Sequence, residues 1–155
     1  MDFTPMKQAG GPPLHRYAQK HKGQHQAMES STSNPNMLSY ARWMVIAVIV
    51  LTLGQASTGL SSRYGFETAS SHALSAQLGL LACLAAVVFV ILSKTEDSKL
   101  KGMSFGLVTA WVVQYGMGEM FASMTWIAHL HAVIAMAILL HAMALLRAFP
   151  SPSDA

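Results

Sequence analysis

Two polar patterns of identical spacing stand in the apolar part of this 155-residue chain. A glutamine, a glycine and a histidine occur twice as Q-x3-G-x12-H, the second copy 59 residues after the first. The two copies are Gln55, Gly59 and His72, and Gln114, Gly118 and His131. Polar side chains inside apolar segments are rare, because they are costly to place in a bilayer, and they are usually functional. Two related hairpins with one histidine each at the same depth are suited to hold a ligand on a pseudo-twofold axis.

Small residues share a helical face with each histidine. At helical spacing His72 is followed by Ala76, Gly79 and Cys83, and His131 is followed by Ala135, Ile138 and Ala142. Such stripes permit close helix packing, and they also leave a slot for a flat macrocycle lying along the helices. Two imidazoles that meet across a slot of this kind are typical axial ligands of haem iron. We therefore expect His72 and His131 to bind one haem b per chain; the alternative is that each is a hydrogen-bonded residue joining two helices.

Four further polar residues are candidates for contacts with the cofactor. Gln55 and Gln114 either join helices through their amides or orient an axial imidazole. Arg63 either holds a haem propionate through charge-assisted hydrogen bonds or sits in water or beside a glutamate. His129 points to a different side of its helix from His131, and we interpret it as an interfacial residue near a propionate. His141 lies about 15 Å deeper than His131 by the helical rise, which favours a packing or proton-handling role.

Two other functions are compatible with the same residues. A methionine and histidine cluster offers the soft ligands that Cu(I) prefers, although methionine is also an adaptable core residue. Its members are Met117, Met120, Met124, His129 and His131. Alternatively, the chain is a cofactor-free membrane scaffold or assembly protein, in which the repeat is a relic of duplication. The sequence offers no nucleophile, paired carboxylates or phosphate-binding loop, so it does not support an enzyme assignment.

Composition sets the class of protein that must position these residues. With 52% hydrophobic and 11% charged residues, the chain is too apolar for an ordinary soluble domain. Four long stretches have almost no charge, and a bilayer needs about 20 apolar residues per helix. The sequence therefore predicts an all-α, integral membrane, up-down-up-down four-helix bundle made of two parallel hairpin repeats. The predicted segments are a disordered tail at 1–36, a membrane domain at 37–149 with helices at about 38–60, 71–93, 103–122 and 125–148, and a short tail at 150–155.

The distribution of basic residues predicts the orientation. Lysines and arginines precede the first helix, fill the loop between the second and third, and follow the fourth, whereas the two opposite loops contain only Arg63 among basic residues. The positive-inside rule then puts both termini in the cytoplasm of a multi-pass protein of the cell (inner) membrane. The formal charge of +3 is accounted for by these residues and indicates no nucleic-acid partner. The expected partners are the lipid bilayer and either other membrane-complex subunits or a redox protein or quinone.

The phrases LGQASTGL and HALSAQLGLL, with VVQYGMGEM and HLHAVIAMAILLHA, resemble the haem A synthase superfamily over residues 45–148. Each half of those proteins is a four-helix bundle with a histidine at the start of its second and fourth helices. The resemblance implies that His72 and His131 are the axial haem ligands. The family's catalytic half has a glutamate three residues before its first histidine, where this chain has Ala69. Since a second half and paired loop cysteines are also missing, the resemblance implies a haem-holding bundle and not haem A synthesis.

Overall fold

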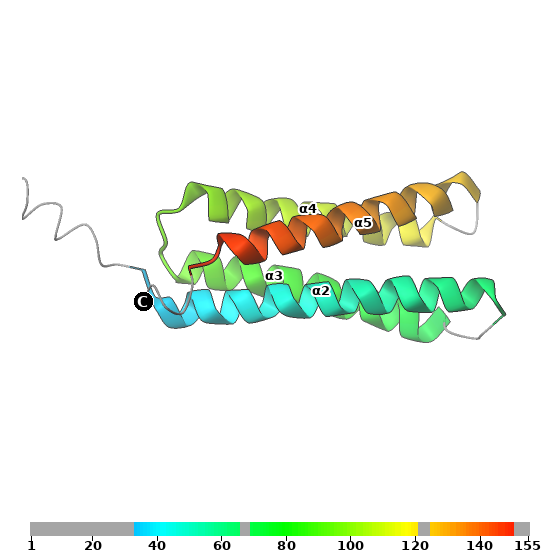
Figure 1. Cartoon of the computed structure of the whole chain (residues 1–155), viewed down its shortest axis with the longest axis horizontal. Helices are drawn as coiled ribbons and strands as arrows, with labels where there is room; N and C mark the ends of the chain where they lie inside the picture. The colour runs from blue at the N-terminus through cyan, green and yellow to red at the C-terminus, as the bar shows by residue number, and fades with distance from the viewer. Residues whose placement is uncertain (1–32, 66–68, 121–124, 151–155) are drawn as a thin grey trace, which may run out of the picture. The chain divides into compact units, whose positions relative to one another are not determined.

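The described part of the chain is entirely helical (Figure 1). The computed structural model describes residues 33–65, 69–120 and 125–150. Within these ranges the chain forms four α-helices and no strand, which confirms the all-α prediction for them. The helices are α2 (Pro35–Arg63), α3 (Ala69–Leu92), α4 (Ser98–Glu119) and α5 (Thr125–Ala148). Of the predicted tails at 1–36 and 150–155, residues 1–32 and 151–155 lie outside the described residues, and Pro35 and Asn36 already belong to α2.

Two helices begin about one turn earlier than the sequence predicted. At the start of α2, Asn34 Oδ1 accepts hydrogen bonds from the backbone N–H of Asn36 (3.1 Å) and Met37 (3.4 Å), and Pro35 occupies the first helical position. At the start of α4, Asp97 Oδ1 accepts from Leu100 N at 3.0 Å. The predicted starts at about 38 and about 103 lie later in the chain because they mark where the apolar stretch begins. A capped helix also takes in the polar turn before that stretch.

Each helix packs against two neighbours. α2 contacts α3 and α5, and α4 contacts the same two helices. Consecutive helices run in opposite directions (Figure 1). Within the described residues, the backbones of α3 and α5 make no contact with each other, and neither do those of α2 and α4. The two helices that carry His72 and His131 are therefore diagonal partners, with α2 and α4 filling the other corners.

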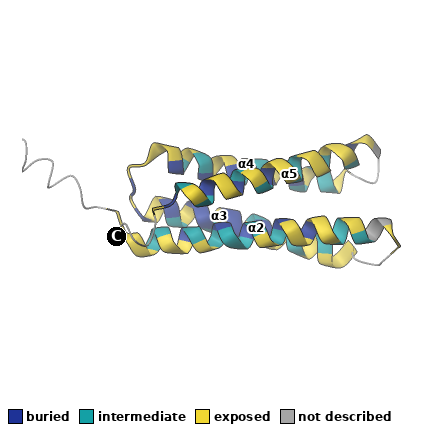
Figure 2. Cartoon of the chain, viewed as in Figure 1, coloured by how far each residue is buried: buried dark blue, intermediate teal, exposed yellow. Residues whose placement is uncertain are grey.

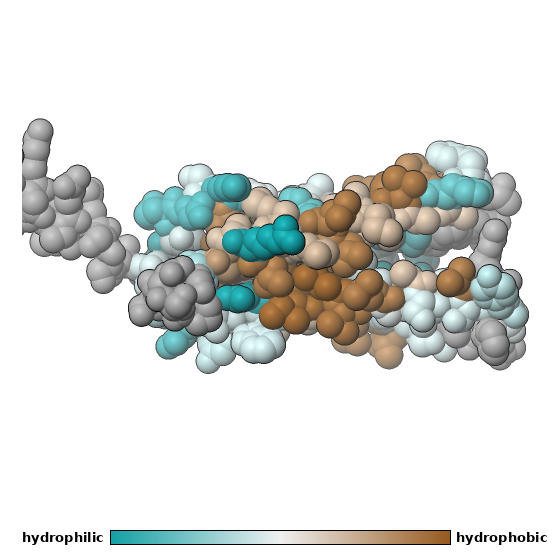
Figure 3. All heavy atoms as spheres, viewed as in Figure 1, coloured by the Kyte–Doolittle hydropathy of each residue, from teal (hydrophilic) through white to brown (hydrophobic). Residues whose placement is uncertain are grey.

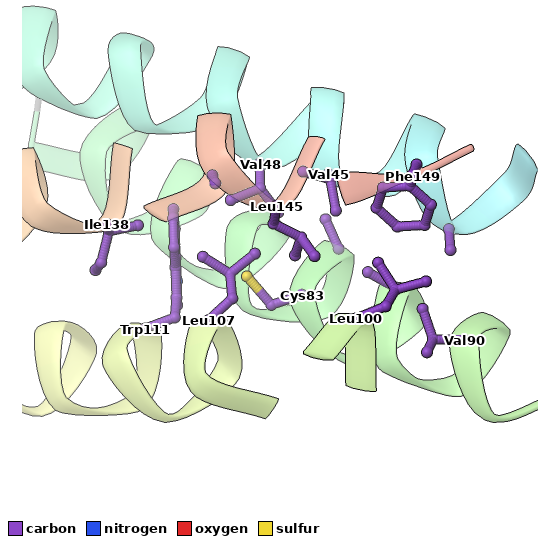
Figure 4. Packing of buried hydrophobic residues seen from close by; sticks show 14 residues of the cluster. Val45, Val48, Cys83, Val90, Leu100, Leu107, Trp111, Ile138, Leu145 and Phe149 are labelled. Carbon is purple, nitrogen blue, oxygen red and sulfur yellow. The ribbon is translucent and has the colours of Figure 1, made fainter. Parts of the chain in front are cut away.

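The hydrophobic core occupies one half of this bundle, where α3 is joined to α4 (Figure 2). We call this the packed half: residues 35–52, 79–92, 98–111 and 138–149. Val45, Cys83, Leu107 and Leu145 bring one side chain from each helix into its centre (Figure 4). The remainder, residues 53–63, 69–78, 112–119 and 125–137, is called the histidine half. Its only buried side chains among those described are Gln55, Gln114 and Ile127.

A tryptophan closes the packed half toward the histidines. The indole of Trp111 is 1% exposed, and its Nε1–H donates to the Ala76 carbonyl oxygen at 3.1 Å. A Cβ atom built on Gly79 would lie only 2.0 Å from Trp111 Cζ2, so the glycine is what admits the indole. This corrects one expectation from the sequence. At Gly79, the small-residue stripe that begins at His72 is covered by the indole of Trp111. Any slot for a macrocycle on α3 would therefore have to lie between His72 and Gly79.

Three helices are long and apolar enough to cross a membrane: α2 over Pro35–Ser61, α3 over Ala69–Leu92, and α5 over Trp126–Ala148. Apolar side chains gather over the middle of the face drawn in Figure 3, and hydrophilic ones lie toward both ends. α4 is less apolar, since it contains Gln114 and several glycines. These findings agree with the prediction of a helical membrane protein.

Candidate functional site

The structure brings His72 and His131 together across the diagonal of the bundle. His72 lies in the first turn of α3 and His131 in the second turn of α5. The centroids of the two imidazole rings are 6.3 Å apart, and the ring planes are tilted by 44°. Both side chains are half-buried. Because their helices are diagonal partners, the two rings approach one another across the space that the four helices enclose.

The ring of His72 is held by the preceding helix. Its Nδ1 lies 3.0 Å from the hydroxyl oxygen of Thr58 on α2. The same hydroxyl donates to the backbone carbonyl oxygens of Gly54 and Gln55, each at 3.1 Å. A Cβ atom on Gly59 would lie 3.5 Å from His72 Cε1, which is ordinary van der Waals contact, so the ring edge lies beside the glycine.

The ring of His131 lies against the preceding helix in a related way. A Cβ on Gly118 of α4 would lie 3.6 Å from His131 Cε1. The position equivalent to Thr58 in the second pattern is Met117, which has no hydroxyl. Each histidine thus lies beside a glycine of the preceding helix, but only His72 has a threonine hydroxyl at the position before that glycine.

The two glutamines face the interior without touching the imidazoles through any recorded hydrogen bond. Gln55 is 9% exposed and Gln114 is 4% exposed. The Oε1 atom of Gln114 is buried and has no hydrogen-bond partner among the described residues. Such an atom is costly to bury in an apolar surrounding. The side-chain contact that orients His72 comes from Thr58 instead.

Thr58 is the site residue that sequence reasoning missed. The sequence does contain a signal for this residue: Thr58 directly precedes Gly59, and its hydroxyl therefore lies close to the helix face on which Gly59 meets α3. The comparison of the two patterns concealed it, because the corresponding residue is a methionine.

The other predicted site residues are spread over the same end of the bundle. His129 is exposed, on a different side of α5 from His131. Arg63 ends α2, and its side chain lies outside the described residues, as does Met124. Met117 is half-buried and Met120 is exposed. In the described ranges no group of three or more histidine, cysteine, aspartate or glutamate side chains could hold a metal ion. The imidazole pair by itself is therefore not a closed metal site of protein ligands.

His141 belongs to the packing of the bundle. Its Nε2 lies 2.8 Å from the Met103 carbonyl oxygen on α4, and a Cβ on Gly106 would lie 3.5 Å from its ring. A carbonyl can only accept, so Nε2 is the donor, and the bond joins two neighbouring helices. This agrees with the packing interpretation of His141.

Comparisons with protein-family models, with curated proteins and with solved structures gave no match for this chain. The haem A synthase resemblance therefore rests on the residues quoted above, and the function has to be argued from the site itself.

Proposed function

We propose that this protein is a b-type haem protein of the membrane, with His72 and His131 as the two axial ligands of one haem. The observation that carries the proposal is the 6.3 Å separation of the imidazole ring centroids across the bundle diagonal. A metal–imidazole bond is about 2 Å, and a ring nitrogen lies roughly 1 Å from its ring centre. Two imidazoles that share one metal ion therefore have centres roughly 6 Å apart. The spacing fits a shared iron.

The donor set also fits this group. Two histidine ligands are too few for a structural metal ion, but a macrocycle supplies the other four nitrogens and needs the protein only for axial positions. The apolar, weakly packed surroundings suit its flat apolar body. Arg63 ends α2 and His129 is near the start of α5, so both belong to the end of the bundle that contains His72 and His131. They are the residues that would meet the propionates.

The packing of the two halves supports the same conclusion. In the histidine half the inward-facing residues around the imidazoles, among them Thr58, Gly59, Ala76 and Gly118, are only half-buried. Protein interiors are normally close-packed, and cores with voids are destabilised. In the histidine half only three described side chains are buried, so small and apolar inward-facing residues remain that a flat apolar group could cover.

Burial supports an internal repeat. On α2 and α4 the buried positions coincide when the chain is shifted by 59 residues: Ala41, Val45, Val48, Thr52 and Gln55 correspond to Leu100, Ser104, Leu107, Trp111 and Gln114. Four of the six buried residues of α3, Gly79, Cys83, Ala86 and Val90, correspond by the same shift to Ile138, Ala142 and Leu145 of α5 and to Phe149 directly after it. We infer two parallel hairpin repeats related by an axis along the bundle, which makes the imidazoles symmetry partners.

The setting we propose is the cell (inner) membrane, crossed four times, with both termini in the cytoplasm. α4 would cross with the other three, because it packs along two of them and its 22 residues span about 33 Å. In this orientation the histidine half lies toward the outer surface. The resemblance of residues 45–148 to one half of a haem A synthase is compatible with this arrangement.

A haem with two histidine ligands supplies a one-electron redox couple. Because both axial positions are taken, the site favours electron transfer over activation of a bound substrate. The protein residues hold the imidazoles, exclude water and provide an apolar surrounding that sets the potential. The partners we propose are a redox protein or quinone, or other subunits of a respiratory-type membrane complex.

The test is the absorption spectrum of the purified full-length chain after expression with haem supplied, recorded oxidised and reduced. We expect the spectrum of a six-coordinate low-spin b-type haem, at one haem per chain. His72→Ala and His131→Ala should each abolish it or convert it to a five-coordinate form. His141→Gln is the matched control, since it alters a half-buried histidine outside the pair. Absence of a Soret band in the folded wild-type chain would support the cofactor-free scaffold instead, and copper without haem would support the Met/His cluster.

A further inference from the structure

The two imidazoles are not equivalent in how they are held, and the hydroxyl of Thr58 makes the difference. Its oxygen lies 3.0 Å from His72 Nδ1 and 3.1 Å from each of the carbonyl oxygens of Gly54 and Gln55. A threonine hydroxyl has one hydrogen and two lone pairs. Carbonyl oxygens can only accept, so the single hydrogen is directed to them, as is usual for a threonine within a helix.

It follows that the hydroxyl accepts where it meets the imidazole. A neutral imidazole carries its hydrogen on one nitrogen and a lone pair on the other, and the partner of one nitrogen decides which. With Thr58 as acceptor, Nδ1 of His72 carries the hydrogen. Nε2 then carries the lone pair, which is the form a metal ligand needs.

We propose that Thr58 is a positioning residue that fixes His72 in its Nδ1–H tautomer and so makes Nε2 the nitrogen available for axial ligation. This inference rests on the proposed haem site for its purpose, but the tautomer itself is a property of the chain without haem. On the opposite helix pair the position equivalent to Thr58 is Met117, which has no hydroxyl. His72 is therefore the proposed ligand whose tautomer depends on a side-chain hydroxyl that mutation can remove.

The first experiment measures the tautomer in the full-length chain prepared without haem. Histidine is labelled with ¹⁵N, and the His72 ring signals are assigned by their loss in His72→Gln. We expect the Nδ1–H form in the wild-type chain and in Thr58→Ser, which keeps the hydroxyl. Thr58→Val, which has nearly the same shape, should lose that form. Thr52→Val is the matched control, because Thr52 donates to Val48 O at 2.7 Å on the same helix and has no recorded contact with a histidine.

The second experiment measures haem affinity and midpoint potential of the same variants. Loss of a hydrogen bond that orients a metal-bound histidine typically weakens binding tenfold to a hundredfold. We expect a loss of roughly that size in Thr58→Val, a higher midpoint potential because the imidazole becomes a weaker donor, and recovery of both in Thr58→Ser.

The two experiments test the role of Thr58 and the proposed haem binding independently of each other. An Nε2–H form of His72 in the wild-type chain, or an unchanged tautomer in Thr58→Val, overturns the role of Thr58 even if haem binds. If the tautomer changes as expected but the wild-type chain takes up no haem, Thr58 still fixes the ring and the proposed function falls. Should Thr58→Val not fold, the wild-type and Thr58→Ser spectra decide the question alone.

Discussion

The packed half and the histidine half are built from the same four helices, but they are stabilised by different means. In the packed half, each helix buries a stripe of apolar side chains around Trp111 and Leu107. In the histidine half, the inward positions are mostly glycine, alanine and polar residues, and only three described side chains are buried. The difference shows a bundle whose apolar core is concentrated at one end, whereas the histidine pair lies at the other end.

Trp111 marks the boundary between the two halves, and its truncation gives the largest expected effect. Trp111→Ala removes a 1% exposed indole together with its bond to the Ala76 carbonyl. Large-to-small changes of this kind cost about 3–5 kcal/mol of unfolding free energy. Unfolding in detergent, followed by circular dichroism, measures the loss. Val112→Ala, at an exposed neighbouring position, should change it by less than about 0.5 kcal/mol.

A smaller loss of unfolding free energy is expected when Gly79, which contacts Trp111, is replaced. In Gly79→Ala the new methyl group would meet Trp111 at 2.0 Å, so the indole has to shift, at about 1–3 kcal/mol of stability. Gly54→Ala is the control, since nothing lies within 4 Å of its added Cβ, and alanine there should be neutral or stabilising. Equal unfolding curves for the two variants would contradict the packing at the boundary.

His141→Leu tests the interhelical bond within the packed half. The variant loses the 2.8 Å hydrogen bond to the Met103 carbonyl oxygen. Hydrogen bonds between membrane helices contribute about 0.6 kcal/mol on average, so the expected loss is roughly 0.5–1 kcal/mol. The same unfolding assay measures it. Haem content should stay unchanged, and a variant that loses haem would place His141 in the site.

Gln114→Leu gives the smallest expected change in unfolding free energy. It tests whether a buried polar residue of the histidine half contributes less to stability than the residues of the packed half. Without haem, the Oε1 atom has no recorded partner, so its replacement should leave stability unchanged or raise it by up to about 1 kcal/mol. A loss of more than about 2 kcal/mol in the haem-free chain would show that the amide has a structural partner and that the histidine half is packed by itself.

The sequence was sufficient for the features that follow from periodicity. Apolar stretches predicted all four helices, and the repeated spacing predicted that His72 and His131 meet, because equivalent residues of two hairpins lie at the same depth. The ends of α2 and α4 were misplaced because capping residues such as Asn34 and Asp97 are polar and lie outside the apolar stretch.

Contacts that depend on how neighbouring helices pack could not be predicted from the sequence. Gly79 appeared as one small residue of a stripe, and only the packing shows that it admits the indole of Trp111. Thr58 has an ordinary helical environment in the sequence, and its contact with His72 depends on how closely α2 and α3 pack.

The most direct test of the imidazole pair is electron paramagnetic resonance of the ferric, haem-loaded chain with imidazole rescue. We predict the low-spin signal of an iron with two imidazole ligands in the wild-type protein. His72→Gly and His131→Gly should each become high-spin and return to the low-spin signal when free imidazole is added. A low-spin signal that persists in both glycine variants without imidazole would mean that other residues bind the iron, and it would contradict the account.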